Sequence, residues 1–304
     1  MDVIEVAGLH KRYGEVVAVH DVGFTVARGE VFGILGRNGA GKTTAVECVS
    51  GLRAPDRGRI GVLGLDPRRD RKRLRQVLGV QLQEAVLPDA LRVGEAVALY
   101  RSFYRDGADP DRLLADLGLT EQKRTPFGAL SGGQAQRVSI ALALVGNPRV
   151  AVLDELSTGL DPRARREIWA LVERIRDSGV TVVLVTHVMA EAERLCDRIA
   201  VLDAGRVLAL DTPAGLVERA GLGQRVRLRP LAPFEHALLA DLPGVTGVGA
   251  DGAEVVVTGT GDLLAAVSSA LARYGIAATG TRLERPGLED AFLELTGRGA
   301  AEVA

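Results

Sequence analysis

A glycine-rich octapeptide between two apolar segments is the feature that most constrains this fold. Residues 36–43 read Gly-Arg-Asn-Gly-Ala-Gly-Lys-Thr, which fits the pattern G-x-x-x-x-G-K-[ST]. The preceding run, 31–35, is typical of a buried strand, and the following segment, 44–49, has the pattern of a helix. In this setting glycines let the loop point its N–H groups at phosphates, and the helix adds the positive end of its dipole. The sequence therefore predicts a nucleoside-triphosphate site.

The loop itself supplies most of the expected phosphate contacts. Lys42 would reach the β- and γ-phosphates, and the hydroxyl of Thr43 would bind Mg²⁺. A glycine-rich turn with a surface lysine is the alternative, and the flanking strand and helix patterns argue against it. The residues predicted to bind the nucleotide here are Gly36, Asn38, Gly39, Ala40, Gly41, Lys42, Thr43 and Thr44.

Two carboxylates follow the apolar run 150–153, which predicts a second buried strand. Asp154 is placed to bind Mg²⁺, directly or through water, and Glu155 to polarise the attacking water. Carboxylates are also common where a strand simply meets solvent, so the pair alone does not decide between the two interpretations. The phosphate loop favours the catalytic one, because phosphoryl transfer needs a metal, a phosphate cradle and a water-positioning group together.

A histidine ends a third apolar run, 180–186. A single histidine at a strand end is usually structural. In an open α/β sheet, however, ligands bind at the carboxyl ends of the strands, and three predicted strands end at Gly36, Asp154 and His187. We therefore expect these residues in one site, where His187 would bond the γ-phosphate or the attacking water.

Ser131, Gly132, Gly133 and Gln134 precede a helical pattern at 138–145. Ser131 and Gln134 have the spacing of a capping box, so an ordinary helix start is a serious alternative. The two glycines weaken a helix but allow an anion to approach its N-terminus closely. We expect these four residues to contact a phosphate group.

Buried apolar runs alternate with helical patterns over residues 1–220, which predicts an α/β fold with a mostly parallel sheet. An alternating stretch at 22–26 adds an antiparallel β subdomain, and Leu, Arg and Asp at helical spacing predict a helical insertion at about 74–147. Strand and helix patterns after a boundary near 221–223 predict a small C-terminal α+β domain at 225–304.

Composition narrows the classes of partner. The chain has 304 residues and a formal net charge of −1, so we expect no general attraction to nucleic acid. The two cysteines, Cys48 and Cys196, lie among apolar residues and make no disulfide framework. No apolar run reaches the ~20 residues that cross a bilayer, and no leader pattern is visible at the N-terminus, so we expect no membrane pore from this chain alone.

Together these motifs resemble the ATP-binding subunit of an ATP-binding-cassette (ABC) transporter. The resemblance covers most of residues 1–220 and follows the family's order: phosphate loop, signature motif at Ser131, acidic strand end at Asp154, D-loop at 157–161 and switch histidine at His187. One departure is Leu156, because the family usually has proline after the catalytic glutamate. This departure puts the D-loop turn in doubt but leaves the carboxylates in place.

The resemblance implies further site residues. Tyr13 would stack on adenine, and Asp161 of the D-loop would contribute to the nucleotide site. Gln83 would link Mg²⁺ and the attacking water to a transmembrane partner. Gln81 is a competing choice for that role, and Gln83 is preferred because it stands just before the helical insertion.

The resemblance also implies ligands and partners, namely ATP, Mg²⁺, a second ATPase subunit and a separate transmembrane permease. Two cassettes would face each other head to tail, with each ATP between the phosphate loop of one and the Ser131 turn of the other. The chain carries one set of motifs, so we expect it to pair with a copy of itself or with a relative. The permease would hold it at the cytoplasmic face of the cell membrane.

Two segments narrow the expected activity. The ending, 287–297, and the run 160–165 resemble the daunorubicin-resistance type of exporter ATPase, which implies export of a drug-like or lipid-like compound. A helix that packs only on its own domain also explains the ending. The main alternative is a soluble cassette acting on nucleic acid or ribosomes, which is disfavoured by the single motif set and the lack of sustained heptads. A nucleotide-binding regulator with little hydrolysis fits less well, since it needs neither Glu155 nor His187.

Overall fold

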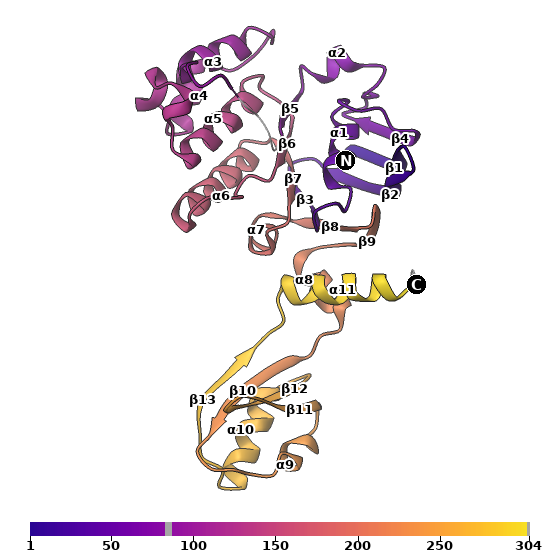
Figure 1. Ribbon diagram of the computed structural model, residues 1–304, viewed down its shortest axis with the longest axis vertical. Coiled ribbons are helices and arrows are strands. Elements are labelled where there is room, and N and C mark those ends of the chain that lie inside the picture. Colours follow the sequence, from indigo (N-terminus) through magenta and orange to yellow (C-terminus); the bar gives the residue numbers. More distant parts are fainter. Residues whose placement is uncertain (83–86, 303–304) are drawn as a thin grey trace. The chain divides into compact units, whose positions relative to one another are not determined.

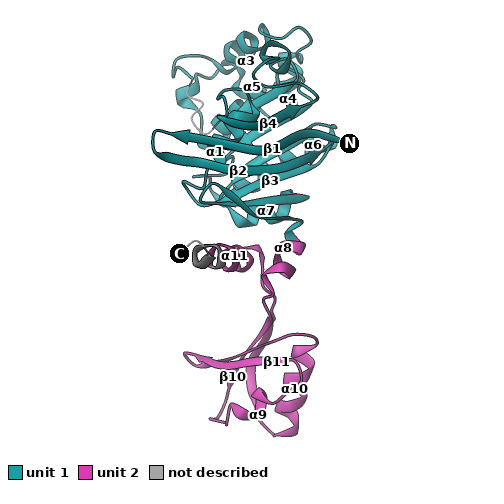
Figure 2. Cartoon of the chain, turned by 90° about the vertical axis from the view of Figure 1, so that its right-hand side faces the viewer, with its two compact units in different colours: residues 1–213, 299–304 teal, residues 214–298 magenta. Residues whose placement is uncertain are grey.

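The computed structural model describes residues 1–82 and 87–302, with side chains described up to residue 297. The chain divides into two compact units, coloured separately in Figure 2. The first is built mainly from Met1–Pro213, and the second is Ala214–Arg298. Every residue proposed for the nucleotide site lies in the first unit.

A six-stranded sheet forms the centre of the first unit, with the strand order β5-β6-β7-β3-β8-β9. Five of its strands run parallel, and β9 pairs antiparallel with β8 at the edge. All residues of β3, β6 and β7 are buried, as their continuous apolar runs predict. The strands are β3 (Val31–Gly36), β5 (Leu78–Gln81), β6 (Val150–Asp154), β7 (Thr181–Thr186), β8 (Arg198–Asp203) and β9 (Arg206–Asp211).

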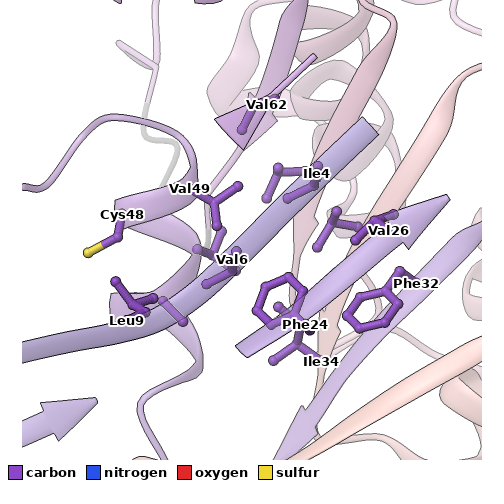
Figure 3. Packing of buried hydrophobic residues seen from close by; sticks show 14 of the residues in the cluster. Ile4, Val6, Leu9, Phe24, Val26, Phe32, Ile34, Cys48, Val49 and Val62 are labelled. Atoms are coloured by element: carbon purple, nitrogen blue, oxygen red, sulfur yellow. The ribbon is translucent and has the colours of Figure 1, made fainter. Parts of the chain in front are cut away.

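A second, three-stranded antiparallel sheet has the order β2-β1-β4. Its strands are β1 (Asp2–Tyr13), β2 (Val16–Ala27) and β4 (Arg57–Val62). Their alternating apolar side chains form one core with α1 (Lys42–Val49) and with side chains of the central sheet. In Figure 3 the rings of Phe24 from β2 and Phe32 from β3 lie together, with centroids 5.2 Å apart. This packing fixes the strand that leads into the phosphate loop.

Helices supply the rest of the first unit (Figure 1). The helical insertion consists of α3 (Val93–Arg101), α4 (Pro110–Asp116) and α5 (Gly132–Leu144), with short 3₁₀ turns at Glu121–Arg124 and Phe127–Ala129. It begins later than residue 74, because residues 78–81 pair with β6 as a strand of the central sheet. The remaining helices are α2 (Arg71–Leu74), α6 (Pro162–Asp177) and α7 (Met189–Leu195).

The second unit is a four-stranded antiparallel sheet, with helices between its strands. The order along the chain is β-α-β-β-α-β, a split arrangement in which β10 and β13 are neighbours. One sheet face packs on α10, whose Leu263, Val267, Ala270 and Leu271 are buried as their spacing predicts. The elements are α8 (Pro213–Ala220), β10 (Gln224–Pro230), α9 (Ala237–Ala240), β11 (Val245–Asp251), β12 (Glu254–Gly259), α10 (Leu263–Arg273), β13 (Ala278–Glu284) and α11 (Leu288–Glu302).

The predicted fold class is confirmed: a mostly parallel sheet, an antiparallel β subdomain, a helical insertion and a small α+β unit. The second unit begins at Ala214, before the boundary expected near 221–223. Among the described residues, no helix has both the length and the apolar character that a membrane span requires.

Candidate active site

Three neighbouring strands bring the expected residues to one edge of the central sheet. The strands β6, β7 and β3 are adjacent and parallel, so their carboxyl ends lie side by side (Figure 1). The phosphate loop follows β3, the acidic pair ends β6, and His187 follows β7. Residues that end three separate apolar runs in the sequence therefore lie at the same edge of one sheet.

The phosphate loop needs glycine at two positions for reasons of backbone packing. Gly41 has a φ of 94°, and a Cβ placed on it would lie 2.3 Å from the carbonyl oxygen of Ala18. A Cβ on Gly36 would lie 2.4 Å from the carbonyl oxygen of Leu202. Any side chain at either position would displace the loop. Arg37, at the start of the loop, is exposed.

Lys42 is held at the base of this loop. Its side chain is buried, and Nζ donates hydrogen bonds to the carbonyl oxygens of Gly36 at 2.9 Å and Arg37 at 3.1 Å. Burial lowers the pKa of the ammonium group, while the charges of Glu155 and Asp154 act in the opposite direction. A cation in this field is placed to neutralise phosphate oxygens.

Asp154 is 1% exposed, and neither of its carboxylate oxygens has a well-aligned hydrogen-bond partner among the described residues. Burial and, to a smaller extent, the neighbouring charge of Glu155 raise its pKa to about 6, while the charge of Lys42 acts in the opposite direction. The hydroxyl of Thr43 also lowers this pKa, although it does not complete a hydrogen bond of good geometry. A buried carboxylate with two unpaired oxygens suits a hard cation.

The donors around Asp154 fit Mg²⁺ rather than a metal held by protein alone. Within the described part of the chain, no group of three or more His, Cys, Asp and Glu residues could hold a metal ion. A cation at Asp154 would therefore take its other ligands from the Thr43 hydroxyl, phosphate oxygens and water. Mg²⁺ characteristically binds proteins in this way, through one or two protein oxygens together with a substrate phosphate.

Glu155 and His187 form a pair beside Asp154. Nδ1 of His187 lies 3.1 Å from Oε1 of Glu155. The glutamate side chain is 8% exposed and the histidine 37% exposed, so the pair stands at the boundary between core and solvent. Glu155 has a φ of 51°, and its N–H donates to the carbonyl oxygen of Val185 at 2.9 Å. This left-handed residue directs the chain out of β6 and holds the carboxylate at the strand end.

The signature turn is an exposed, capped helix N-terminus. The side chain of Ser131 accepts from the N–H of Gln134 at 3.3 Å, and the side chain of Gln134 accepts from the N–H of Ser131 at 2.9 Å. The N–H groups of Gly132 and Gly133 have no acceptor within the helix, because they belong to its first turn. This turn lines a surface hollow formed by residues from 118–122, 131–137 and 159–167, a set that includes no phosphate-loop residue.

The D-loop lies between β6 and α6 and ends in a second helix cap. The Asp161 side chain accepts hydrogen bonds from the N–H groups of Arg163 and Ala164, and these bonds lower its pKa. Leu156, which stands where the family usually has proline, is fully buried. Leu156 therefore contributes to the core in place of the proline, and the D-loop after it still ends in the helix cap at Asp161.

Tyr13, the residue expected to stack on adenine, has an accessible ring. Tyr13 ends β1 and is 39% exposed, with the guanidinium group of Arg53 5.1 Å from its ring centre. An accessible aromatic ring at this place is compatible with stacking on a base. Gln83 lies outside the described residues.

Some contacts near the site carry no signal in the sequence. The side chain of Gln81, considered above only as a rival of Gln83, bonds the backbone of Asp154. Arg137 of α5 pairs with Glu167 of α6, and Trp169 of α6 donates to Glu191 of α7. These pairs depend on how the helices are oriented, so spacing alone does not reveal them.

Comparison with known proteins agrees with this geometry. The family profile described as "ABC transporter" matches residues 19–158. The chain is 40% identical to the daunorubicin resistance ATP-binding protein DrrA3 of Streptomyces coeruleorubidus, over 97% of this chain and 96% of that protein. It is 37% identical to the Nod factor export ATP-binding protein I of Rhizobium johnstonii, over 97% and 95%.

Solved structures show the same cassette. An ATP-binding subunit of an ABC transporter superposes with a TM-score of 0.65 and 29% identity, over 72% of this chain and 93% of that one. A dimeric ATP-binding cassette in a post-hydrolysis state, bound to ADP and Pi, superposes with a TM-score of 0.61 and 26% identity, over 69% and 98%.

Proposed function

The chain belongs to the ATP-binding subunits of ABC transporters and is an ATPase of that family; we propose that it drives export of a drug-like or lipid-like compound through a separate membrane subunit. The observation that carries the catalytic part is the cluster of Lys42, Asp154, Glu155 and His187 at one sheet edge. Relatives named for daunorubicin resistance and for Nod factor export support the transport part. They do not support the alternative action on ribosomes.

Each residue of the cluster has a task that follows from its chemistry. The ammonium group of Lys42 has three protons, so its two carbonyl bonds leave one for a phosphate oxygen. Asp154 and Thr43 would hold Mg²⁺, which neutralises charge on the β- and γ-phosphates. Gly36, Asn38, Gly39, Ala40, Gly41 and Thr44 complete the proposed loop contacts, and Tyr13 would stack on adenine.

Glu155 is the proposed general base, and His187 the residue that holds it in place and contacts the γ-phosphate or the water. The 3.1 Å contact between them restricts the glutamate to one side of the strand end. A base must lie within hydrogen-bond reach of the water that it polarises, so this restriction favours turnover. Gln83 is proposed to sense the water and the metal from the segment that follows β5.

ATP is proposed to lie between two protomers. The signature turn presents N–H groups that have no acceptor within their own helix, and the hollow that it lines includes no phosphate-loop residue. An anion from a second chain would satisfy these donors and complement the helix dipole. Ser131, Gly132, Gly133, Gln134 and Asp161 would thus complete the site of the partner, in a symmetric head-to-tail dimer.

The surface for the membrane subunit is proposed to be a hollow beside β5. Two of its lining residues are exposed apolar side chains, Leu52 at 47% and Phe103 at 64%, and Lys72, Arg73 and Arg105 supply its cationic rim. Leu78 and Val80 of β5 also line it. A membrane subunit docked here would hold the chain at the cytoplasmic face of the membrane.

Co-purification tests the proposed function. We expect the chain isolated from membranes to bring a span-containing subunit, and Phe103→Asp to lose that subunit while keeping ATP binding. Leu231→Asp serves as the control, because Leu231 is equally exposed at 67% but lies in the second unit. Recovery of ribosomes or nucleic acid without any membrane protein would contradict the assignment to transport.

A further inference from the structure

The strand β5 ends beside the metal carboxylate, and one side chain continues the hydrogen bonding there. In the parallel pair of β5 and β6, Gln81 lies opposite Leu153 and is the last residue of β5. The N–H of Glu155 points toward β7, where it bonds Val185, so the N–H of Asp154 points the other way, toward β5. The register of β5 with β6 ends at this pair, so Asp154 has no paired residue in β5.

The amide of Gln81 takes that place. Its Oε1 accepts from the N–H of Asp154 at 3.0 Å, and its Nε2 donates to the carbonyl oxygen of Leu82 at 2.8 Å. The N–H can only donate and the carbonyl can only accept, so the two partners fix the orientation of the amide. Gln81 is 4% exposed, and solvent therefore does not replace these bonds easily.

We propose that Gln81 is a positioning residue for the metal site, because its amide ties the backbone of Asp154 to the first residue of the segment that follows β5. The proposal rests on the nucleotide function assigned above. Asp154 has no other well-aligned side-chain hydrogen bond among the described residues, so the position of its carboxylate depends on its backbone. Movement of the segment at Leu82 would then shift the metal ligand directly.

The test compares nucleotide affinity with and without Mg²⁺ in the full-length chain. The probe is a non-cleavable ATP analogue, titrated by calorimetry in excess Mg²⁺ and again in EDTA. Gln81→Met keeps the side-chain length but removes both bonds. For this variant we expect the ratio of the affinity in Mg²⁺ to the affinity in EDTA to fall about tenfold, as it does when other groups that orient metal ligands are removed. Affinity in EDTA should stay near the wild-type value.

Gln76→Met is the matched control. Its amide also bonds two backbone groups, the N–H of Arg105 at 3.1 Å and the carbonyl oxygen of Phe103 at 3.2 Å, but at an exposed position. We expect it to leave the ratio of the two affinities unchanged. A folded Gln81→Met protein with the wild-type ratio would overturn the positioning role. Failure of wild-type protein to bind the analogue at all would instead refute the nucleotide function.

Hydrogen exchange in the wild-type chain provides a second measurement in case the methionine variant does not fold. Mg²⁺ is added to protein that already holds the analogue. We expect amide exchange to slow in the peptide that contains residues 78–82 together with the peptide that contains residues 150–155. Slowing confined to residues 150–155 would show that Asp154 is not tied to the end of β5.

Discussion

Glu155 stands in a left-handed conformation that a glutamate rarely adopts, and the same residue carries the proposed base. Its φ of 51° costs about 1 kcal/mol, which the surrounding packing of β6 and β7 must offset. The buried Asp154 beside it adds an electrostatic cost. At the scale of single residues, the site thus places backbone strain and a buried charge at adjacent positions, and a bound cation would offset the charge.

The first prediction concerns Glu155→Gln. The amide keeps the size of the side chain but cannot accept a proton from water, so we expect ATP binding to persist and turnover to fall by roughly 10² to 10⁴-fold. Steady-state phosphate release and nucleotide titration measure the two properties separately. Turnover near the wild-type rate would remove Glu155 from the role of base.

The second prediction concerns Asp154 and pH. Its folded-state pKa, raised to about 6, exceeds its ordinary value of 3.8, so the folded protein loses stability as pH rises through this interval. In EDTA without nucleotide, Asp154→Asn should be more stable than wild type by about 2–3 kcal/mol at pH 8 and nearly equal at pH 4. Urea denaturation at the two pH values measures the difference. A variant that is less stable at pH 8 would contradict the burial argument.

At the scale of elements, α6 has polar contacts with the helices on both sides. Arg137 of α5 pairs with Glu167, and the indole N–H of Trp169 donates to Oε1 of Glu191 at 3.0 Å. Glu191 lies in the first turn of α7, shortly after His187. It is fully buried, and its second oxygen has no hydrogen-bond partner among the described residues. The helix capped by Asp161 is thus connected to both the signature helix and the segment after the switch histidine.

The third prediction tests the bond between Trp169 and Glu191. Trp169→Phe removes the one side-chain hydrogen bond that the buried Glu191 carboxylate makes among the described residues, so it should lower the free energy of unfolding by about 1–3 kcal/mol. Adding Glu191→Leu should recover part of this loss, because the unpaired group is then gone. Urea unfolding followed by circular dichroism gives the complete double-mutant cycle. Simple additivity of the two substitutions would show that the bond contributes nothing.

Sequence patterns predicted the strands that are buried on both faces and the helices that begin at a recognisable cap. The runs at β3, β6 and β7 are apolar along most of their length because both faces are covered, and the capping-box spacing of Ser131 and Gln134 marks a helix start. The sequence patterns did not predict the strands β11 and β13, because both lie at the edges of their sheet and neither contains a buried residue. The proposed role of Gln81 could not be predicted either, because it depends on the residue at which β5 ends, and the sequence pattern does not fix that residue.

At the scale of the whole molecule, the two units have separate cores. The strands β10 and β12 with α10 form the core of the second unit, and every proposed site residue lies in the first. Motif order across residues 1–220 predicted the first unit as a cassette. The boundary expected near 221–223 follows α8, whereas the second compact unit begins at Ala214 and takes in most of that helix, including the buried Leu216 and Ala220.

The fourth prediction follows from this division. A chain that ends at Pro213 should bind ATP with an affinity within about threefold of the full chain, since its unit keeps its own core and all proposed contacts. Calorimetry on both chains in Mg²⁺ makes the comparison. Loss of binding in a truncated chain that remains folded would show that the second unit takes part in the site.

The central claim is that ATP is held by two protomers, and mixing two inactive variants tests it most directly. Lys42→Ala disables the phosphate loop, and Ser131→Arg blocks the signature turn, so each protein alone should show almost no ATPase activity. In a mixed dimer, one site combines an intact phosphate loop with an intact signature turn. An equal mixture should therefore recover about a quarter of the wild-type rate, because half of randomly formed dimers are mixed and each has one intact site. A mixture no more active than its two components would show that the site is not shared in this way.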